Sequence, residues 1–189
     1  MLPAELDHLI AQIDACEADA ERLVADLDDE SVNWVPPPAP GASRWSIAQC
    51  VTHLTLMNEF YLRGWSAAVD EAAAREHGAF AGLRPTIFGR WFARSMEPPP
   101  RMKTKANAVA TPGARIPLAG LVDAYNASHQ GYRHLVRASA ALDINRVVRR
   151  NPFIKAVRMR LSTVLLIVPA HDRRHLWQAA NVKRALRGA

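Results

Sequence analysis

Four long segments of the chain repeat their apolar residues every three or four positions, and proline-rich or arginine-rich stretches separate them. They cover about residues 3–29, 47–76, 118–142 and 162–187. This period gathers the apolar side chains on one stripe of an α-helix, and a stripe that long must be buried against other helices. No segment shows the alternation of apolar and polar residues that marks a strand. The pattern therefore predicts an all-α protein built as a four-helix bundle.

The connections between these helices differ in length and composition. Residues 31–44 hold four prolines and cannot continue a helix, because proline lacks the backbone donor and crowds the preceding turn. Residues 78–117 hold six prolines and form a long excursion between the second and third helices. Loops of that length in compact domains are usually functional or mobile, so we expect substrate specificity to reside there. An arginine-rich connection, residues 143–160, precedes the fourth helix.

Local signals mark where the second and fourth helices begin and bend. Ser46 and Gln49 form a capping box, in which the hydroxyl and the amide satisfy unpaired backbone groups at the start of the second helix. Ser162 is the expected N-cap of the fourth helix. Pro169 lies inside that helix and predicts a bend just before His171.

A chain of 189 residues is long enough to bury a core without help. It can bury about 70% of the surface that its unfolded form exposes, so neither a disulfide nor a structural metal is needed. We expect one domain over residues 1–189, in which any metal site serves function. The two cysteines, the lack of a signal-peptide pattern and the lack of a bilayer-length apolar stretch favour a cytoplasmic protein with no membrane partner.

The net charge of +6 is unevenly distributed. Residues 1–30 contain ten acidic residues and one basic residue, whereas residues 133–187 contain thirteen basic residues and two acidic ones. If the two end helices are neighbours, these blocks attract each other, and much of the basic charge is neutralised within the protein. The sequence also lacks a helix-turn-helix, zinc-finger or RNP-like pattern, so we expect no nucleic-acid partner.

Three histidines are candidate metal ligands. His171 and His175 are four residues apart in the fourth helix, so both imidazoles lie on one face, with their β-carbons about 6 Å apart. His53 belongs to an apolar stripe of the second helix and faces the bundle interior. A single histidine in such a position is more often a hydrogen-bonded core residue than a metal ligand. Three inward histidines from two packed helices, however, match a catalytic type of site, with three protein ligands and an open position.

Helix geometry places other polar residues around the histidine pair. Gln178 lies within about 20° of the His171 direction, and Arg174 lies on the flank of the same face, where it can pair with a substrate carboxylate. Arg173 points away, toward solvent or the acids of the first helix. His129 of the third helix is either a further polar group near the ion or a satisfied core histidine, and we favour the second.

Several short motifs occur together along the chain. They are Asn33-Trp34 followed by prolines, Trp45-Ser46-Ile47, His53-Leu54, residues 98–104, and His171-x-x-Arg174-His175-x-x-Gln178. In these motifs the sequence resembles the DinB-like superfamily, and within it a small bacterial branch whose last helix reads HxRRHxxQ. The resemblance implies a four-helix bundle, often dimeric, that holds a divalent metal, zinc or nickel, through His53, His171 and His175.

The same resemblance implies an activity and draws attention to one departure. Members of known activity commonly transfer a low-molecular-weight thiol or use one to assist isomerisation. Related sequences commonly carry Glu where this chain has Asp172. Asp172 projects about 100° from His171 on a helical wheel. It can therefore either support a metal-binding histidine without contacting the metal itself, or lie on the surface.

The ligand set suggests how such a site works. Three neutral histidines leave the ion its full Lewis acidity, so it lowers the pKa of a bound thiol or water to near neutrality. The leading hypothesis is a divalent-metal-dependent enzyme that activates a low-molecular-weight thiol or water for attack on a small-molecule substrate, which Arg174 and Gln178 bind. The alternatives are a metal-dependent hydrolase and a non-catalytic ligand-binding or stress-response bundle. The sequence identifies no further residue as a catalytic group.

Overall fold

The computed structural model describes residues 1–38, 44–75, 78–99, 108–151, 154 and 156–188. Helix accounts for 68% of the chain, so the protein belongs to the all-α class that the sequence predicts. Part of the motif at residues 98–104, and the predicted end of the second helix at residue 76, lie outside the described residues.

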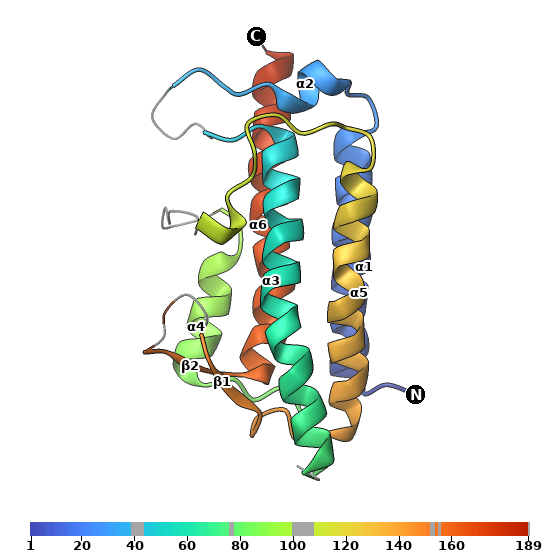
Figure 1. Ribbon diagram of the computed structural model, residues 1–189, viewed down its shortest axis with the longest axis vertical. Helices are drawn as coiled ribbons and strands as arrows, with labels where there is room; N and C mark the ends of the chain where they lie inside the picture. Colours follow the sequence, from blue (N-terminus) through green and yellow to red (C-terminus); the bar gives the residue numbers. More distant parts are fainter. Residues whose placement is uncertain (39–43, 76–77, 100–107, 152–153, 155, 189) are drawn as a thin grey trace.

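Four long helices form the body of the molecule, as can be followed in Figure 1. They are α1 (Ala4–Val24), α3 (Ile47–Ala74), α5 (Leu121–Ala138) and α6 (Leu161–Arg187). α3 contacts α5 and α6, and α1 contacts the same two helices, so each long helix packs against two others. Among the described residues, no helix is both long enough and apolar enough to cross a membrane.

Shorter elements lie in the connections between the long helices. They are α2 (Asp29–Asn33), α4 (Ile87–Met96), the 3₁₀ turns η1 (Ala108–Ala110) and η2 (Ser139–Ala141), and the strands β1 (Val148–Arg150) and β2 (Arg158–Arg160). The strands pair antiparallel, with Arg149 opposite Met159. The sequence predicted no strand, and that prediction is wrong here. Three residues per strand are too few to show the alternation by which a strand is recognised.

The helix starts confirm one predicted cap and correct another. The hydroxyl of Ser46 accepts from the backbone N–H of Gln49 at 3.2 Å, and the Gln49 side chain accepts from the backbone N–H of Ser46 at 3.0 Å, so the capping box is confirmed. α6 begins at Leu161, its N-cap position is Arg160, and Ser162 is buried rather than capping. The reason is topological, because β2 runs directly into α6 and brings the helix start forward.

The first helix is shorter than predicted. α1 ends at Val24, and Asp28 starts the separate helix α2 by accepting a hydrogen bond from the backbone N–H of Ser31 at 2.8 Å. An aspartate in an extended conformation at this position stops one helix and caps the next. Pro169 lies within the span of α6, and the bend expected there stays a prediction.

The oppositely charged ends of the chain meet along α1, α5 and α6. Lys183 and Arg187 of α6 both pair with Asp26, and Arg133 of α5 pairs with Glu17 of α1. The predicted internal neutralisation therefore takes place for these residues. The arginines of β1 and β2 lie near the opposite, N-terminal end of α6.

Two apolar clusters fill the interior, and a layer of buried polar residues lies between them. Along α5, Tyr125 belongs to one cluster and Tyr132 to the other, and the buried His129 lies between the two. The same order holds on α6, where Asp172 occupies the intermediate position, and on α3, where Asn58 does. On α6, His171 and His175 lie on either side of Asp172 in the sequence, so these two candidate ligands adjoin the polar layer.

Substitution of Gly89 tests how closely α4 packs against α6. A Cβ atom at this position would lie 2.5 Å from Oγ1 and 2.9 Å from Cγ2 of Thr163, so the glycine permits the close packing of the two helices. We expect Gly89→Ala to displace α4 and to lower the free energy of unfolding by about 1–3 kcal/mol, measured by urea denaturation.

The matched control is Gly64→Ala in α3, because no atom lies within 4 Å of a Cβ at that position. The free energy of unfolding of this control should rise by about 0.5–1 kcal/mol, because alanine is more favourable than glycine within a helix. The double variant Gly89→Ala, Thr163→Ala should lose less free energy of unfolding than the sum of the losses in the two single variants. Equal stabilities of the Gly89→Ala and Gly64→Ala variants would contradict the close packing.

Candidate metal centre

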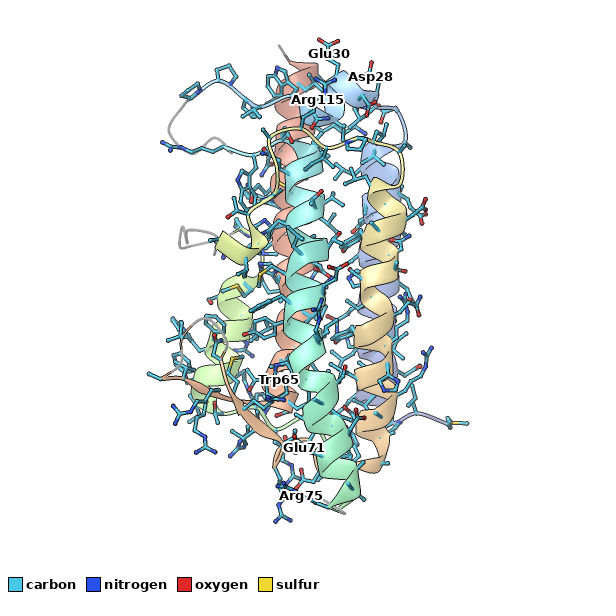
Figure 2. All side chains as sticks on the ribbon, in the orientation of Figure 1. Asp28, Glu30, Trp65, Glu71, Arg75 and Arg115 are labelled. Atoms are coloured by element: carbon cyan, nitrogen blue, oxygen red, sulfur yellow. The ribbon has the colours of Figure 1, made fainter. Side chains whose placement is uncertain are left out.

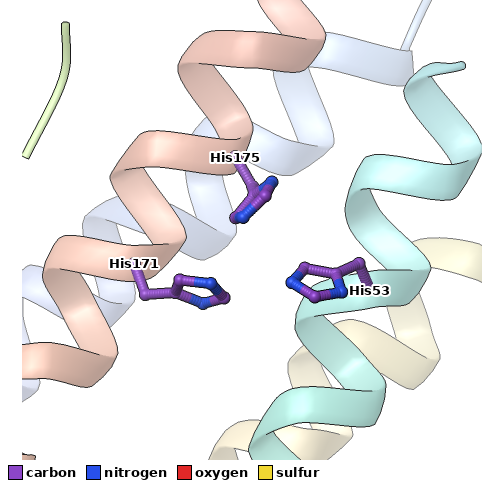
Figure 3. Close-up of side chains that lie close together, drawn as sticks. All are labelled: His53, His171 and His175. Atoms are coloured by element: carbon purple, nitrogen blue, oxygen red, sulfur yellow. The ribbon is translucent and has the colours of Figure 1, made fainter. Parts of the chain in front are cut away.

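Three histidines from two helices point toward one another between α3 and α6 (Figure 3). The ring centroid of His53, from α3, lies 5.3 Å from that of His171 and 4.6 Å from that of His175. The two α6 rings have their centroids 4.6 Å apart. Each residue offers one nitrogen, and the three nitrogens lie within 4.8 Å of one another. The structure therefore brings together the three histidines identified from the sequence.

The local sequence explains this convergence. His171 and His175 are one helical turn apart, so their side chains lie on the same face of α6. His53 lies on the inner stripe of α3 beside the buried residues Cys50 and Leu54. Because α3 packs directly on α6, the two histidine-bearing faces meet.

The hydrogen bonds of the histidines determine which nitrogens are available. Nδ1 of His53 lies 2.7 Å from the carbonyl oxygen of Ala110 in η1. Since a carbonyl only accepts, this Nδ1 donates, and Nε2 keeps its lone pair. Nδ1 of His175 is buried and has no hydrogen-bond partner among the described residues. A buried polar atom without a partner is costly, and a coordinated cation is one way to satisfy the imidazole that carries it.

Burial lowers the pKa of all three imidazoles. For His171, the loss of solvent contact, followed by the charges of His53 and Arg174, lowers the pKa to about 3. Burial and the same kinds of neighbour lower the pKa of His175, and a hydrogen bond with Gln178 opposes that shift. Burial also lowers the pKa of His53. All three imidazoles are therefore neutral at neutral pH, which is the protonation state that binds metal.

The donor set fits a metal centre with an open coordination position. Imidazole nitrogen is a good ligand for zinc, nickel, copper and iron. Structural zinc sites take four protein ligands, whereas three protein ligands leave a position for water or substrate. Within the described part of the chain, these three histidines form the only such cluster of His, Cys, Asp or Glu side chains.

Trp45 covers one side of this cluster. The centroid of its ring system lies 4.8 Å from the His53 ring and 5.9 Å from the His175 ring. An aromatic wall of this kind limits solvent access to the histidines and lowers the local dielectric constant. Sequence reasoning missed this contact, because Trp45 precedes the helix and no helical period reports on its direction.

Arg174 and Gln178, the predicted substrate-binding residues, both lie next to the histidines. The Arg174 side chain is largely buried, and one of its nitrogens lies 3.5 Å from the carbonyl oxygen of Ser95 in α4. Burial lowers the pKa of the Arg174 guanidinium, and its charge in turn lowers the pKa of His171. Gln178 contacts His175 through the hydrogen bond noted above. The site thus holds one buried cation and one amide beside the three neutral imidazoles.

Asp172, whose position the sequence left open, is fully buried on the other side of α6. Its carboxylate lies 2.8 Å from Nε2 of His129, and the carboxylate of Glu17 lies 3.0 Å from Nδ1 of the same ring. Both ring nitrogens face a carboxylate oxygen, an arrangement that favours the doubly protonated imidazolium form of His129. Arg133 binds the two oxygens of Glu17 from the solvent side. The surface alternative for Asp172 is therefore wrong, and His129 is confirmed as a satisfied core histidine.

Arg173 also differs from its prediction. Instead of facing solvent or the acids of the first helix, it pairs with Glu97 at the end of α4 and donates to the side chain of Gln12 in α1. The sequence could not place Glu97 here, because the position of α4 depends on the path of the long excursion.

A mostly helical chain with three converging histidines defines the class of this protein, and the comparison with protein families specifies it further. The family model of the DinB superfamily matches residues 12–179. Because the match includes most of the chain and all three histidines, the chain belongs to the DinB superfamily, whose members generally bind metal. Comparisons with curated proteins and with solved structures give no match.

The buried His129 pair predicts a specific dependence of stability on pH. Burial lowers the pKa of His129, but the hydrogen bonds and charges of Asp172 and Glu17 outweigh burial and raise it above its ordinary value. The imidazolium therefore contributes stability below pH about 6.5, and this contribution is lost as pH rises through the raised pKa. We expect the free energy of unfolding of the wild type, relative to His129→Gln, to fall above pH about 6.5.

The measurement is urea denaturation at a series of pH values with a chelator present. The three candidate ligand histidines have lowered pKa values and shift stability in the opposite direction, but they are present in both proteins, so their contributions largely cancel in the difference. The control is His134→Gln, on the exposed side of the same helix. A pH-independent difference between wild type and His129→Gln would contradict the charged pair.

Proposed function

We propose that His53, His171 and His175 hold one divalent ion, zinc or nickel, and that the protein is a metal-dependent enzyme activating a low-molecular-weight thiol or water. The observation that carries the proposal is the meeting of three neutral imidazoles, one of them with an unpartnered buried nitrogen. The scaffold we propose is the four-helix bundle with a long excursion between its second and third helices. In it, α3 and α6 supply the ligands.

The proposed chemistry follows from this donor set. An ion bound by three neutral ligands acts as a Lewis acid that lowers the pKa of a thiol or water at the open position, making it a nucleophile near neutral pH. Nδ1 of His53 donates to the Ala110 carbonyl, which fixes the orientation of this imidazole. Trp45 shields the histidines on one side and limits the entry of competing water.

Arg174 has the properties of a substrate-binding group. Its charge is largely removed from solvent and lies close enough to His171 and His175 to lower their pKa values. A guanidinium in such a place favours a ligand that carries a carboxylate, because the pair forms two charge-assisted hydrogen bonds. We therefore propose a small substrate or thiol with a carboxylate near its reacting end, oriented by Arg174 and by the amide of Gln178.

Metal analysis tests the proposed ligands. Protein purified without a histidine tag and incubated with zinc or nickel should hold about one ion per chain by mass spectrometry of its metal content. His171→Ala leaves two ligands and should lose that ion, whereas His134→Ala, on the exposed face of α5, should keep it. A His171→Ala variant with a full complement of metal would exclude the site.

Small thiols test the proposed substrate class. We expect 3-mercaptopropionate to bind the metal-loaded protein more tightly than 2-mercaptoethanol, which lacks the carboxylate. Arg174→Gln should weaken binding of the carboxylate thiol by about 30-fold or more and leave the other thiol little changed, as measured by isothermal titration calorimetry. The matched control is Arg137→Gln, which removes an exposed arginine of α5 away from the histidines. Equal weakening by both substitutions, or of both thiols, would contradict a carboxylate-binding role.

A further inference from the structure

The outer face of α4 is apolar and unusually exposed. The inner face of this helix buries Gly89, Ala93 and Met96. On the outer side, Ile87 is 92% exposed, Phe88 55% and Trp91 54%. Exposed apolar residues are common singly, but three large ones within five residues of a short helix mark a contact surface.

Basic side chains accompany these apolar ones. Arg84, Arg90 and Arg94 are exposed, and residues 84–96 contain no acid. None of these three arginines takes part in an ion pair among the described residues. The nearest acid along the chain, Glu97, pairs with Arg173 instead. We refer to Ile87, Phe88, Arg90, Trp91 and Arg94 as the α4 face.

The hairpin of β1 and β2 extends the positive charge beside α4. The two elements lie together on one side of the molecule, away from α1 and α5 (Figures 1 and 2). Phe88 lines a small cavity with Ile154 and Arg158, and the Arg160 side chain donates to the carbonyl oxygen of Arg84. No acid occurs between Asp143 and Asp172 in the sequence. Among the acids of α1, Asp14 and Glu17 pair with Arg133, and Glu5 accepts from the backbone N–H of Leu83 at the near end of this region. The basic residues of α4 and the hairpin outnumber that single acid.

The charge of the α4 face argues against a second copy of this chain as its partner. Symmetric dimers pair identical surfaces across a two-fold axis. Such a dimer would bring Arg90 and Arg94 of both copies together, with no acid in the face to neutralise them, and like charges at an interface cost several kcal/mol. A partner that suits this face has a negatively charged surface that covers an apolar interior.

We propose that the α4 face docks the protein on a surface of anionic phospholipid. α4 would lie in the plane of the headgroups, with Ile87, Phe88 and Trp91 inserted between them and Arg90 and Arg94 on lipid phosphates. Short amphipathic helices with basic residues and a bulky apolar face bind membranes in this way, and their strength depends on anionic lipid. A lipid surface also accommodates a side chain as prominent as Ile87, which is 92% exposed.

This proposal differs from the expectation of no membrane partner drawn from the sequence. That expectation rested on the lack of a segment long enough to span a bilayer, which requires about 20 apolar residues. α4 has only 10 residues and meets a different criterion, which is the separation of a buried face from an exposed apolar and basic one. The proposal rests on α4 and its neighbours and holds whether or not the three histidines bind metal.

Vesicle sedimentation of the full chain tests the proposal. The wild type should sediment with phosphatidylcholine vesicles that contain phosphatidylglycerol, should not sediment with phosphatidylcholine alone, and should be released by high salt. The double variant Arg90→Gln, Arg94→Gln should bind about 30-fold more weakly. The double variant Ile87→Ser, Trp91→Ser should also lose binding, because both apolar side chains insert.

Matched controls lie elsewhere on the surface. Trp177→Ser removes an exposed tryptophan of α6, and Arg137→Gln removes an exposed arginine of α5, and both should bind vesicles like the wild type. Circular dichroism verifies that every variant is folded. Failure to bind phosphatidylglycerol vesicles would overturn the proposal, and so would equal loss in the controls. A wild-type dimer that Ile87→Ser, Trp91→Ser converts to a monomer in size-exclusion chromatography would assign the face to a second copy instead.

Discussion

The burial of polar side chains at the centre of the interior is the constraint on which the rest of this structure depends. An unpartnered buried polar group costs several kcal/mol, so each member of the polar layer must be paired or neutral. His129 meets this requirement between Glu17 and Asp172, and Asn58 meets it by donating to Ser128. The three candidate ligand histidines meet it in part by remaining uncharged. Apolar clusters on both sides keep water from replacing these partners.

α6 contacts the polar layer and also the helices that surround the candidate metal centre. Successive residues of a helix turn by about 100°, so four neighbouring positions of α6 face four different surroundings. His171 faces α3, Asp172 faces His129 of α5, Arg173 reaches α1 and the end of α4, and Arg174 approaches Ser95. These contacts together determine the rotation of α6 about its axis. The rotation in turn determines where the imidazoles of His171 and His175 point, which is why an ion pair on the far side of the helix matters for the candidate site.

Sequence periodicity was sufficient for the approximate positions of the long helices and for the placement of His171 and His175 on one face, because both depend on spacing within one helix. It was insufficient wherever a residue's surroundings come from a distant segment. Trp45, the carbonyl of Ala110 and the partner of Arg173 all lie outside the helix whose residue they contact. The hairpin of β1 and β2 was missed because its strands are held by cross-strand hydrogen bonds and are too short to show a pattern. The N-cap of α6 was misplaced for the same reason, since the hairpin determines where that helix begins.

The sequence by itself determined the all-α class, the capping box at Ser46 and the placement of His171 and His175 on one face, because each follows from local backbone geometry. Only the tertiary structure decided that His53 reaches that pair, that Asp172 is buried in an ion pair rather than exposed, and that the α4 face remains uncovered. These outcomes depend on which helices become neighbours and on how each is rotated. Packing and electrostatics across the whole interior determine the neighbours and the rotation of each helix. A short stretch of sequence does not contain this information.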